Sequence, residues 1–164
     1  MNAPMLKGAI RWCFLLFLGC LFFACSTHEE DPLYAPQSEI VTELQAEVFD
    51  LVNAHRISQE LPVLDFLDPA YLKAKEHTAY MVELGKPNHD FFFDREAYLV
   101  SVAGAQAVAE NVAYAYNTAE GVVGAWIEST SHKAVIEGDF THASICVMKG
   151  EDGKYFFTQI FVKK

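Results

Sequence analysis

The chain has 164 residues, which suits a single domain, and it carries a formal net charge of −10 at pH 7. Residues 1–24 hold two of the 12 basic residues and none of the 22 acidic ones, so the rest keeps 10 basic against 22 acidic residues, a net charge of −12. Such a domain repels nucleic acid and anionic lipid headgroups, which excludes both as partners of its surface.

The first 24 residues have the composition of a secretion signal. Lys7 and Arg11 precede an apolar run from Trp12 to Ala24 that only Gly19 interrupts. A basic segment, an apolar segment and a small residue before the cleavage point are typical of a signal peptide. The run is shorter than the ~20 residues that a membrane-spanning helix needs. A tilted single-span anchor is the alternative interpretation.

Cleavage is expected directly before Cys25. The segment Leu21-Phe22-Phe23-Ala24-Cys25 resembles the lipobox of bacterial lipoproteins, with Phe22 where these signals prefer Leu. Leu18-Gly19-Cys20 is a rival, but the polar sequence begins only after Cys25. Lipid on Cys25 would anchor the chain to a membrane outside the cytoplasm more firmly than one acyl chain could. Cys146 would then have no disulfide partner.

Residues 25–38 are predicted to be the lipidated cysteine and a flexible tether, and residues 39–164 the folded domain. The tether is polar, acidic and contains two prolines. Its cluster from His28 to Asp31 resembles surface-export tags of some Gram-negative lipoproteins, and a solvated linker is the alternative. The expected location is therefore the bacterial cell envelope, outside the cytoplasm, with display on the cell surface if the cluster is such a tag.

Apolar residues at helical spacing predict four helices in the domain. Ser38 would cap the first, with Pro62 in the loop that follows. Asp68 and Pro69 would start the second, and Gly85 would end it. The inward residues of these two helices are expected to be Ile40, Leu44, Val48, Leu51 and Val52, and then Ala70, Ala74, His77, Met81 and Leu84.

The second half of the domain changes from helical to strand periodicity. A third helix is expected around 95–102, and Thr118 would cap a fourth with Val122, Val123, Trp126 and Ile127 facing inward. The segments 144–148 and 155–162 are strand-like, and Gly150-Glu151-Asp152-Gly153 between them indicates a hairpin. Helices followed by a terminal hairpin predict an α+β fold in which helices are layered on a small antiparallel sheet.

Five segments in chain order carry a family resemblance. They are Leu51-Val52-Asn53-Ala54-His55-Arg56, then Ala74 with His77 and Met81 before Asn88-His89-Asp90, then Ala109-Glu110-Asn111-Val112-Ala113, then Trp126-Ile127-Glu128-Ser129-Thr130-Ser131-His132-Lys133, and last Phe140-Thr141-His142 with Thr158-Gln159-Ile160-Phe161. Together they resemble the bacterial branch of the CAP superfamily, whose domain is also called SCP. That superfamily includes cysteine-rich secretory proteins, plant pathogenesis-related proteins and insect venom allergens.

The resemblance implies an α-β-α sandwich and a surface cleft that holds two histidines and one or two glutamates. The matching positions here are His89, Glu110 and His132. Glu128 is the nearest candidate for the second glutamate but lies one residue early, and Thr130-Ser131 replace the family's Pro-Gly. Asn111 is expected to orient the segment of Glu110 by bonding to backbone.

The chemistry of that cleft has several interpretations. His89, Glu110 and His132 could hold Zn²⁺ with a position left for water, or transfer protons without metal. The alternative is a polar cluster that fixes loops around the sheet. Spacing alone does not decide, because these residues lie ~20 positions apart and form no His-Glu-x-x-His motif. No cofactor is required by the favoured interpretation.

Other chemical residues receive structural interpretations. Ser129 and Ser131 adjoin His132, but there is no Gly-x-Ser-x-Gly elbow for serine catalysis. Cys146 is expected to be a buried, unreactive thiol. The remaining expectations are a core position for His77, a bracing role for His55 and Arg56, a supporting contact of His142 with the cleft, and either a core or a cleft-lining position for Phe91, Phe92 and Phe93.

The favoured function is therefore a lipid-anchored CAP-domain protein that binds a ligand outside the cytoplasm. The ligand would be a lipid, a peptide or an envelope component, with an apolar floor under a few polar groups. The alternative is a hydrolase, metal-assisted or dependent on His and Glu, that acts on peptides or cell-envelope polymers. A purely structural envelope protein is the third interpretation, since one fold hosts many functions.

Overall fold

A computed structural model of the chain describes residues 35–164, with side chains described from residue 42 onward. The predicted signal peptide, Cys25 and most of the tether lie outside the described residues, as does the side chain of Ile40. Within residues 35–164, no helix is long and apolar enough to cross a membrane.

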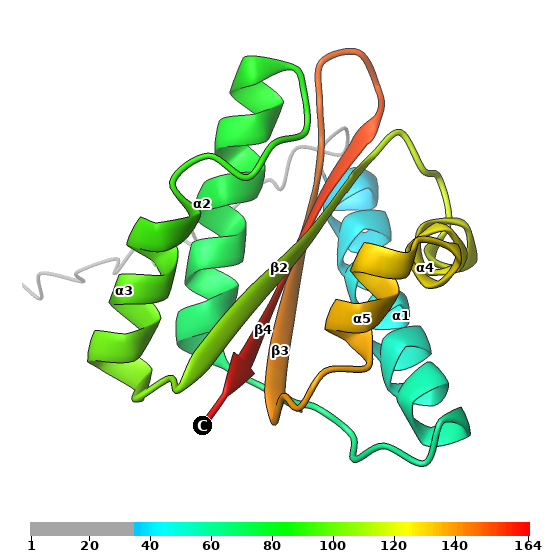
Figure 1. Ribbon diagram of the computed structural model, residues 1–164. Helices are drawn as coiled ribbons and strands as arrows, with labels where there is room; N and C mark the ends of the chain where they lie inside the picture. The colour runs from blue at the N-terminus through cyan, green and yellow to red at the C-terminus, as the bar shows by residue number, and fades with distance from the viewer. Residues whose placement is uncertain (1–34) are drawn as a thin grey trace, which may run out of the picture. The chain divides into compact units, whose positions relative to one another are not determined.

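The described domain has three layers, as the α-β-α prediction required. The middle layer is a four-stranded sheet in the order β1-β3-β4-β2, formed by β1 (Asp65–Phe66), β2 (Ala107–Tyr114), β3 (His142–Lys149) and β4 (Tyr155–Lys163). Helices α2 (Asp68–Leu84) and α3 (Phe92–Ala103) cover one face, and α1 (Ala35–Ser58), α4 (Ala119–Glu128) and α5 (Thr130–Ile136) cover the other (Figure 1). The α+β class is confirmed.

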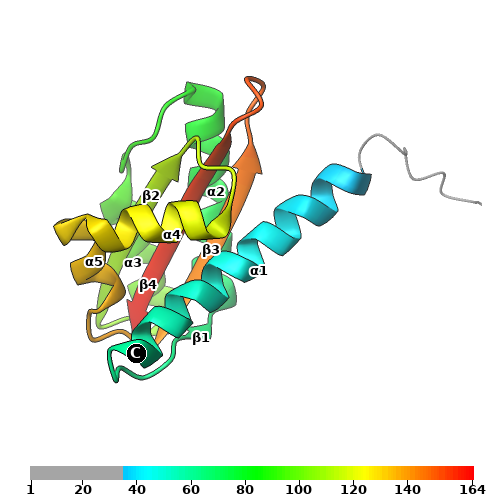
Figure 2. The same cartoon turned by 90° about the vertical axis from the view of Figure 1, so that its right-hand side faces the viewer.

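The sheet is antiparallel except at one edge. β4 pairs antiparallel with both β2 and β3, whereas the two residues of β1 pair parallel with β3. The sheet is therefore mixed, which corrects the expectation of a purely antiparallel one. Figure 2 shows α4 and α1 crossing its face, with β4 between β2 and β3.

Both faces of the sheet are buried, and β4 shows this most clearly. Its residues from 156 to 162 are all buried, because helices cover both sides. Phe157 and Phe161 pack with Trp126 in the layer of α1 and α4. Ile160 and Val162 pack with Leu99 and Cys146 in the layer of α2 and α3. A strand covered on both faces is largely apolar and lacks polar alternation.

Most of the predicted helix ends are confirmed. Thr118 accepts a hydrogen bond from the Gly121 N–H at 3.1 Å and so caps α4. Gly85 ends α2 with the left-handed backbone that glycine adopts easily. The prediction of Ser38 as a cap is wrong, because α1 already begins at Ala35. Leu84, predicted to face inward, is 42% exposed as the last residue of α2.

Three elements were not predicted as such. β1 has two residues and α5 has seven, which is too short for a periodic pattern. β2 has the sequence AVAENVAY, in which small residues dominate and polar ones fall side by side. Both faces of β2 are covered near its middle, so the strand lacks the alternation that reveals a half-exposed one.

Candidate functional site

The site forms around Glu110 in the middle of the edge strand β2. Successive side chains of a strand point to opposite faces, so Glu110 faces α2 and α3 while Asn111 faces α4 and α5. The Glu110 side chain is only 1% exposed although the whole residue is 8% exposed. What solvent reaches at this position is therefore the main chain at the edge of the sheet.

Arg95 and His89 hold the buried carboxylate of Glu110. Arg95, on α3, donates from Nε to Oε2 and from a terminal nitrogen to Oε1, both at 2.8 Å. His89, in the loop before α3, places Nδ1 2.9 Å from Oε1. A ring nitrogen bonded to a carboxylate carries the proton, so Nε2 of His89 is left free on a side chain that is 51% exposed. The buried carboxylate of Glu110 thus holds the exposed imidazole of His89 in one orientation.

His77 is the third side chain that lies beside the Glu110 carboxylate. It is buried on α2, donates from Nε2 to the Asn88 carbonyl at 2.8 Å, and lies 3.7 Å from Oε1 of Glu110. Burial lowers the pKa of His77, although the charge of Glu110 and the bond to Asn88 oppose this effect. His77 is therefore a neutral core histidine, as predicted, and it also supports the loop that carries His89.

The ionisation of Glu110 follows from these contacts. Burial by itself would raise its pKa, but the hydrogen bonds from His89 and Arg95 and the charge of Arg95 outweigh burial and lower the pKa. A carboxylate that is ionised and bonded at both oxygens is a weak proton acceptor. Glu110 can orient His89, but it is poorly placed to act as a general base itself.

His132 lies on the other face of β2. The Asn111 amide donates to the His132 carbonyl at 3.1 Å, which ties α5 to the strand, and His132 Nδ1 bonds Ser129 Oγ at 2.8 Å. Burial lowers the pKa of His132, and the nearby His89 lowers it further. Asn111 bonds to backbone as predicted, but it braces α5 and does not shape a turn at Glu110.

The predicted trio therefore converges only in part. His89 and Glu110 are in direct contact, whereas His132 lies on α5 and is near enough to His89 to be affected by its charge. No hydrogen bond joins His132 to either of them within residues 35–164. The arrangement is therefore a bonded His89–Glu110 pair with the imidazole of His132 nearby on α5.

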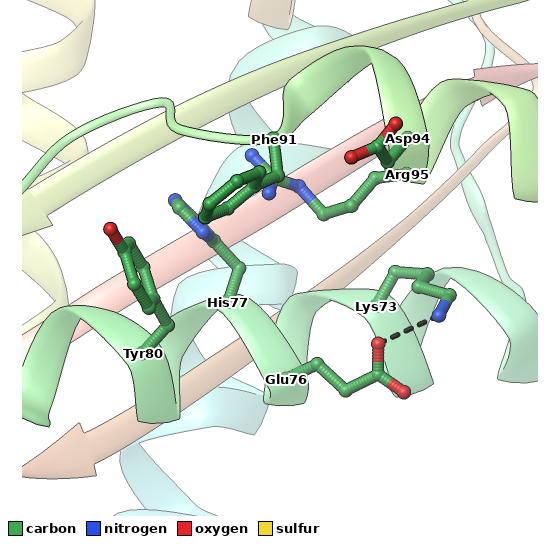
Figure 3. Close-up of a pocket in the computed structure, with 7 residues that line it drawn as sticks. All are labelled: Lys73, Glu76, His77, Tyr80, Phe91, Asp94 and Arg95. Atoms are coloured by element: carbon green, nitrogen blue, oxygen red, sulfur yellow. Dashed lines mark hydrogen bonds and ion pairs between the residues drawn. The ribbon is translucent and has the colours of Figure 1, made fainter.

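A pocket of about 210 Å³ lies beside this cluster, between α2 and the start of α3 (Figure 3). Tyr80 and Phe91 form an aromatic wall, with ring centroids 5.5 Å apart and an edge-to-face orientation. The polar lining comes from Lys73, Glu76, His77, Asp94 and Arg95. The pocket thus joins an apolar wall to groups that contact Glu110.

Phe91 has an unusual backbone for its residue type. It precedes α3 with a φ of 60°, in the left-handed region, and the residue is 63% exposed. A bulky residue in that region costs of order 1–2 kcal/mol, and such strain is concentrated at functional sites. Phe93 is 79% exposed, and Phe92 is half-buried. The cleft-lining interpretation therefore fits Phe91, whereas the core interpretation is wrong for Phe91 and Phe93.

The other predicted site residues lie apart from the cluster. Glu128 is exposed at the end of α4 and forms no hydrogen bond or ion pair with the three among residues 35–164. His142 bonds Thr141 at the start of β3 and has no contact with the cleft among the described residues. Arg56 and His55 brace α1, as expected, against the segment that follows α5. Cys146 is buried, which confirms the prediction of its burial.

The residues present do not fit a zinc ion. Across the described range 35–164, no three His, Cys, Asp or Glu side chains lie close enough to hold a metal. Both oxygens of Glu110 already accept from Arg95, so metal binding would first require displacement of a buried guanidinium. Zinc needs ligands that converge tetrahedrally, and His89 and His132 reach the edge from opposite faces.

Arg95 is the functional residue that sequence reasoning missed. It lies on the buried face of α3 with Leu99, four residues on, and both are almost inaccessible. A charged residue on an apolar helical stripe is rarely buried unless it is paired. That pattern could have indicated a buried acidic partner, and Glu110 is the acidic residue that it holds.

Comparison with known proteins agrees with the fold. The profile of the CAP family, described as the cysteine-rich secretory protein family, matches residues 49–161. The uncharacterized membrane protein YlbC of Bacillus subtilis is 28% identical over 130 residues, which is 77% of this chain but 36% of YlbC. The chain thus spans only about a third of that relative's length.

Solved structures show the same fold at lower identity. An extracellular protein from Bacillus anthracis that contains an SCP domain superposes with a TM-score of 0.69 at 23% identity, over 79% of this chain and 43% of that one. An outer surface protein of Borrelia burgdorferi gives 0.67 at 22% identity, over 74% and 93%. The profile match covers well over half of the chain, and on this basis the chain belongs to the cysteine-rich secretory protein (CAP) family.

Proposed function

We propose that this chain is a lipid-anchored domain outside the cytoplasm that binds a ligand at the cleft of His89, Glu110 and His132. One observation carries the binding role: a half-exposed imidazole is fixed by a buried ion pair. His89 presents Nε2 to solvent because Glu110 and Arg95 hold its other side in place. A polar group that is fixed in advance loses little freedom on binding, which favours affinity.

The surroundings of His89 support the same role. Ligand sites combine an apolar surface with a few well-placed polar groups, and here Tyr80 and Phe91 supply the apolar part. His132 has a lowered pKa and stays neutral near pH 7, so it can both donate and accept hydrogen bonds. The relatives named as membrane, extracellular and outer surface proteins are consistent with a location outside the cytoplasm.

A hydrolase is the second candidate, and the His89–Glu110 contact favours it. A carboxylate that orients Nδ1 of a histidine leaves Nε2 able to take a proton from water. Against this, Arg95 already neutralises Glu110, which weakens the basicity that the carboxylate can lend to the ring. If the protein is a hydrolase, it should cleave casein or peptidoglycan, and His89→Ala should abolish this activity.

The test is a titration of the purified chain with three probes: random peptides, fatty acids and soluble peptidoglycan fragments. NMR of the histidine ring protons reports binding. His89→Ala should lower the affinity of whichever probe binds by about tenfold or more, the loss of at least one directed hydrogen bond. His142→Ala is the matched control, because His142 lies apart from the cleft. Among the described residues, its one side-chain hydrogen-bond partner is Thr141. If no probe shifts the ring signals of His89 or His132, the binding function is wrong.

A further inference from the structure

One edge of the sheet is left without a strand partner beside the cleft. β2 is the last strand in the order β1-β3-β4-β2, so its outer side pairs with no other strand in residues 35–164. Ala115 N–H donates to the Tyr155 carbonyl directly across the ladder. Hydrogen-bonded pairs alternate along an antiparallel ladder, so odd-numbered residues of β2 bond inward. The backbone groups of Val108, Glu110 and Val112 therefore point outward.

A side-chain contact confirms this direction and limits the open stretch. The Trp126 indole donates to the Val112 carbonyl at 3.2 Å, which is possible only if that carbonyl faces away from β4. Trp126 thus closes the edge at Val112. Val108 and Glu110 have no hydrogen bond on this side from any residue within 35–164, and the exposed part of Glu110 is its main chain.

The open edge lacks the usual protection against pairing. Exposed edge strands are normally blunted by lysine, proline or a bulge along their length. Residues 107–110 are Ala-Val-Ala-Glu, and the one charged side chain among them turns inward to Arg95. Nothing on this stretch of the strand would repel another extended chain.

A groove runs along the same stretch on the side of α5. It has a volume of about 610 Å³ and is walled by small and apolar residues, with an ion pair between Lys163 and Asp139 at 2.7 Å on its rim. Its apolar lining consists of Ala107, Ala109, Ala134, Val135 and Phe140. α5 carries His132 near its N-terminal end and Ala134 and Val135 further along, so His132 and one wall of the groove belong to the same short helix.

We infer that the ligand of this cleft is an extended polypeptide segment that adds to the free edge of β2. Its main chain would exchange hydrogen bonds with the N–H and carbonyl groups of Val108 and Glu110, the mode called strand addition. Alternate side chains would enter the α5 groove, which fits small or apolar residues. The charge of the domain disfavours acidic segments. Because Trp126 stops the added strand, the segment would end between His89 and His132.

This inference rests on the proposed function, since it names the ligand class of the same cleft. The probe is a phage-displayed library of random twelve-residue peptides, from which enriched sequences are synthesised. Amide hydrogen exchange of the full chain then reports the contact directly. We expect bound peptide to slow exchange at Val108 and Glu110 and to leave Val112 unchanged. Binding that leaves the first two amides unprotected would overturn strand addition.

Two valines of β2 provide a matched pair of variants. Both have outward N–H groups and half-buried side chains, so proline removes the same kind of donor at each. Val108→Pro should weaken peptide binding by about tenfold or more, since it removes a bonded donor, whereas Val112→Pro should leave it within about twofold. Equal effects of the two changes would contradict the inference. If either variant unfolds, N-methylation of alternate peptide amides gives the same comparison with the unaltered chain.

Failure of this inference can be told apart from failure of the binding function. Fatty acid or peptidoglycan binding that depends on His89, with no peptide enriched, would preserve the function and overturn strand addition. No binding by any probe would overturn both. Protection of Val108 and Glu110 that grows with protein concentration in the absence of peptide would show pairing of two copies at this edge, which also overturns the proposed ligand.

Discussion

At the residue scale, the site consists of a buried ion pair that acts as a brace and an exposed imidazole that can contact a ligand. Glu110 and Arg95 are nearly inaccessible and satisfy each other, whereas His89 is half-exposed and has a free nitrogen. The two groups should therefore respond differently to substitution. Stability should depend on the brace, and ligand affinity on the exposed ring.

The first prediction concerns this division. Glu110→Gln should lower the free energy of unfolding by ~3 kcal/mol or more, because it leaves the Arg95 charge buried and unpaired. His89→Ala should cost only ~1 kcal/mol, because its ring is partly solvated. Glu128→Gln is the control, since that side chain is exposed and should change nothing. Urea denaturation measures all three, and equal losses for Glu110→Gln and Glu128→Gln would contradict the brace.

Cys146 gives a second prediction. Burial raises its pKa to about 11, even though Thr78 opposes the shift. At pH 7.5 the reactive thiolate is then a fraction of roughly 3 × 10⁻⁴, compared with ~10% for a free cysteine. Native protein treated with iodoacetamide should carry at least ~100-fold less label on the Cys146 peptide than unfolded protein does. Comparable labelling in both states, read by peptide mass mapping, is the contrary result.

His77, which is buried, and His132, which is half-buried, predict how stability depends on pH. The folded-state pKa values of His77 and His132 both lie below 6.5, chiefly because of burial. As pH falls through 6.5 the unfolded chain binds protons that the folded chain does not, so stability decreases. The lowered pKa of Glu110 adds a loss in the same direction below pH 4.5. The urea concentration at the unfolding midpoint should be lower at pH 5.5 than at pH 7.5. The difference should be smaller in the double variant His77→Gln/His132→Gln. A wild-type midpoint that holds or rises is the contrary outcome.

At the scale of elements, one buried side chain near the end of α1 bonds to several separate segments of the chain. Arg56 is buried and donates to the carbonyls of Pro62, Ile136, Gly138 and Phe140 at 2.7–3.2 Å. It thereby joins the end of α1 to the segment between α5 and β3. A guanidinium fork can satisfy several carbonyls at fixed angles, and an ammonium group cannot.

Arg56→Lys should therefore behave as a severe change although it retains the positive charge. We expect a loss of ~3 kcal/mol, because several buried carbonyls lose their donors and the ammonium stays desolvated. Lys73→Arg is the control, since Lys73 pairs with the exposed Glu76. Thermal denaturation measures both. Full stability of Arg56→Lys would show that water replaces the lost donors without cost.

The sequence predicted long, one-sided elements better than short or doubly covered ones. α4 was readable because Thr118 marks its start and Trp126 its buried face. β2 was missed because each of its faces is covered, so Ala, Val and Asn show no period. The contact of His89 with Glu110 followed from family resemblance alone, since 21 residues separate them. Arg95 had only its place on the apolar stripe of α3 as a signal, and that signal does not identify Glu110 as its partner.

At the scale of the whole molecule, the N-terminal region is predicted to determine where the domain acts. We predict lipid attachment at Cys25, because the apolar segment ends and the polar one begins there. The intact mass of membrane-extracted protein should correspond to a chain that starts at Cys25 and carries acyl groups. Cys25→Ser should keep the unprocessed mass and lose the lipid. A wild-type chain that is soluble, or that begins elsewhere, would exclude this anchor.

The position of β4 in the chain has a consequence for biogenesis. β4 is a central strand, and β2 is joined to β3 only through it, yet it follows every other described element in the sequence. A ribosome must therefore release residues 155–163 before the sheet can close. Until then the sheet lacks the strand that joins β2 to β3, and both hydrophobic clusters lack the side chains that β4 contributes. The strand order thus postpones closure of the sheet until synthesis has passed the last strand, and this delay suits the export that the N-terminal sequence predicts.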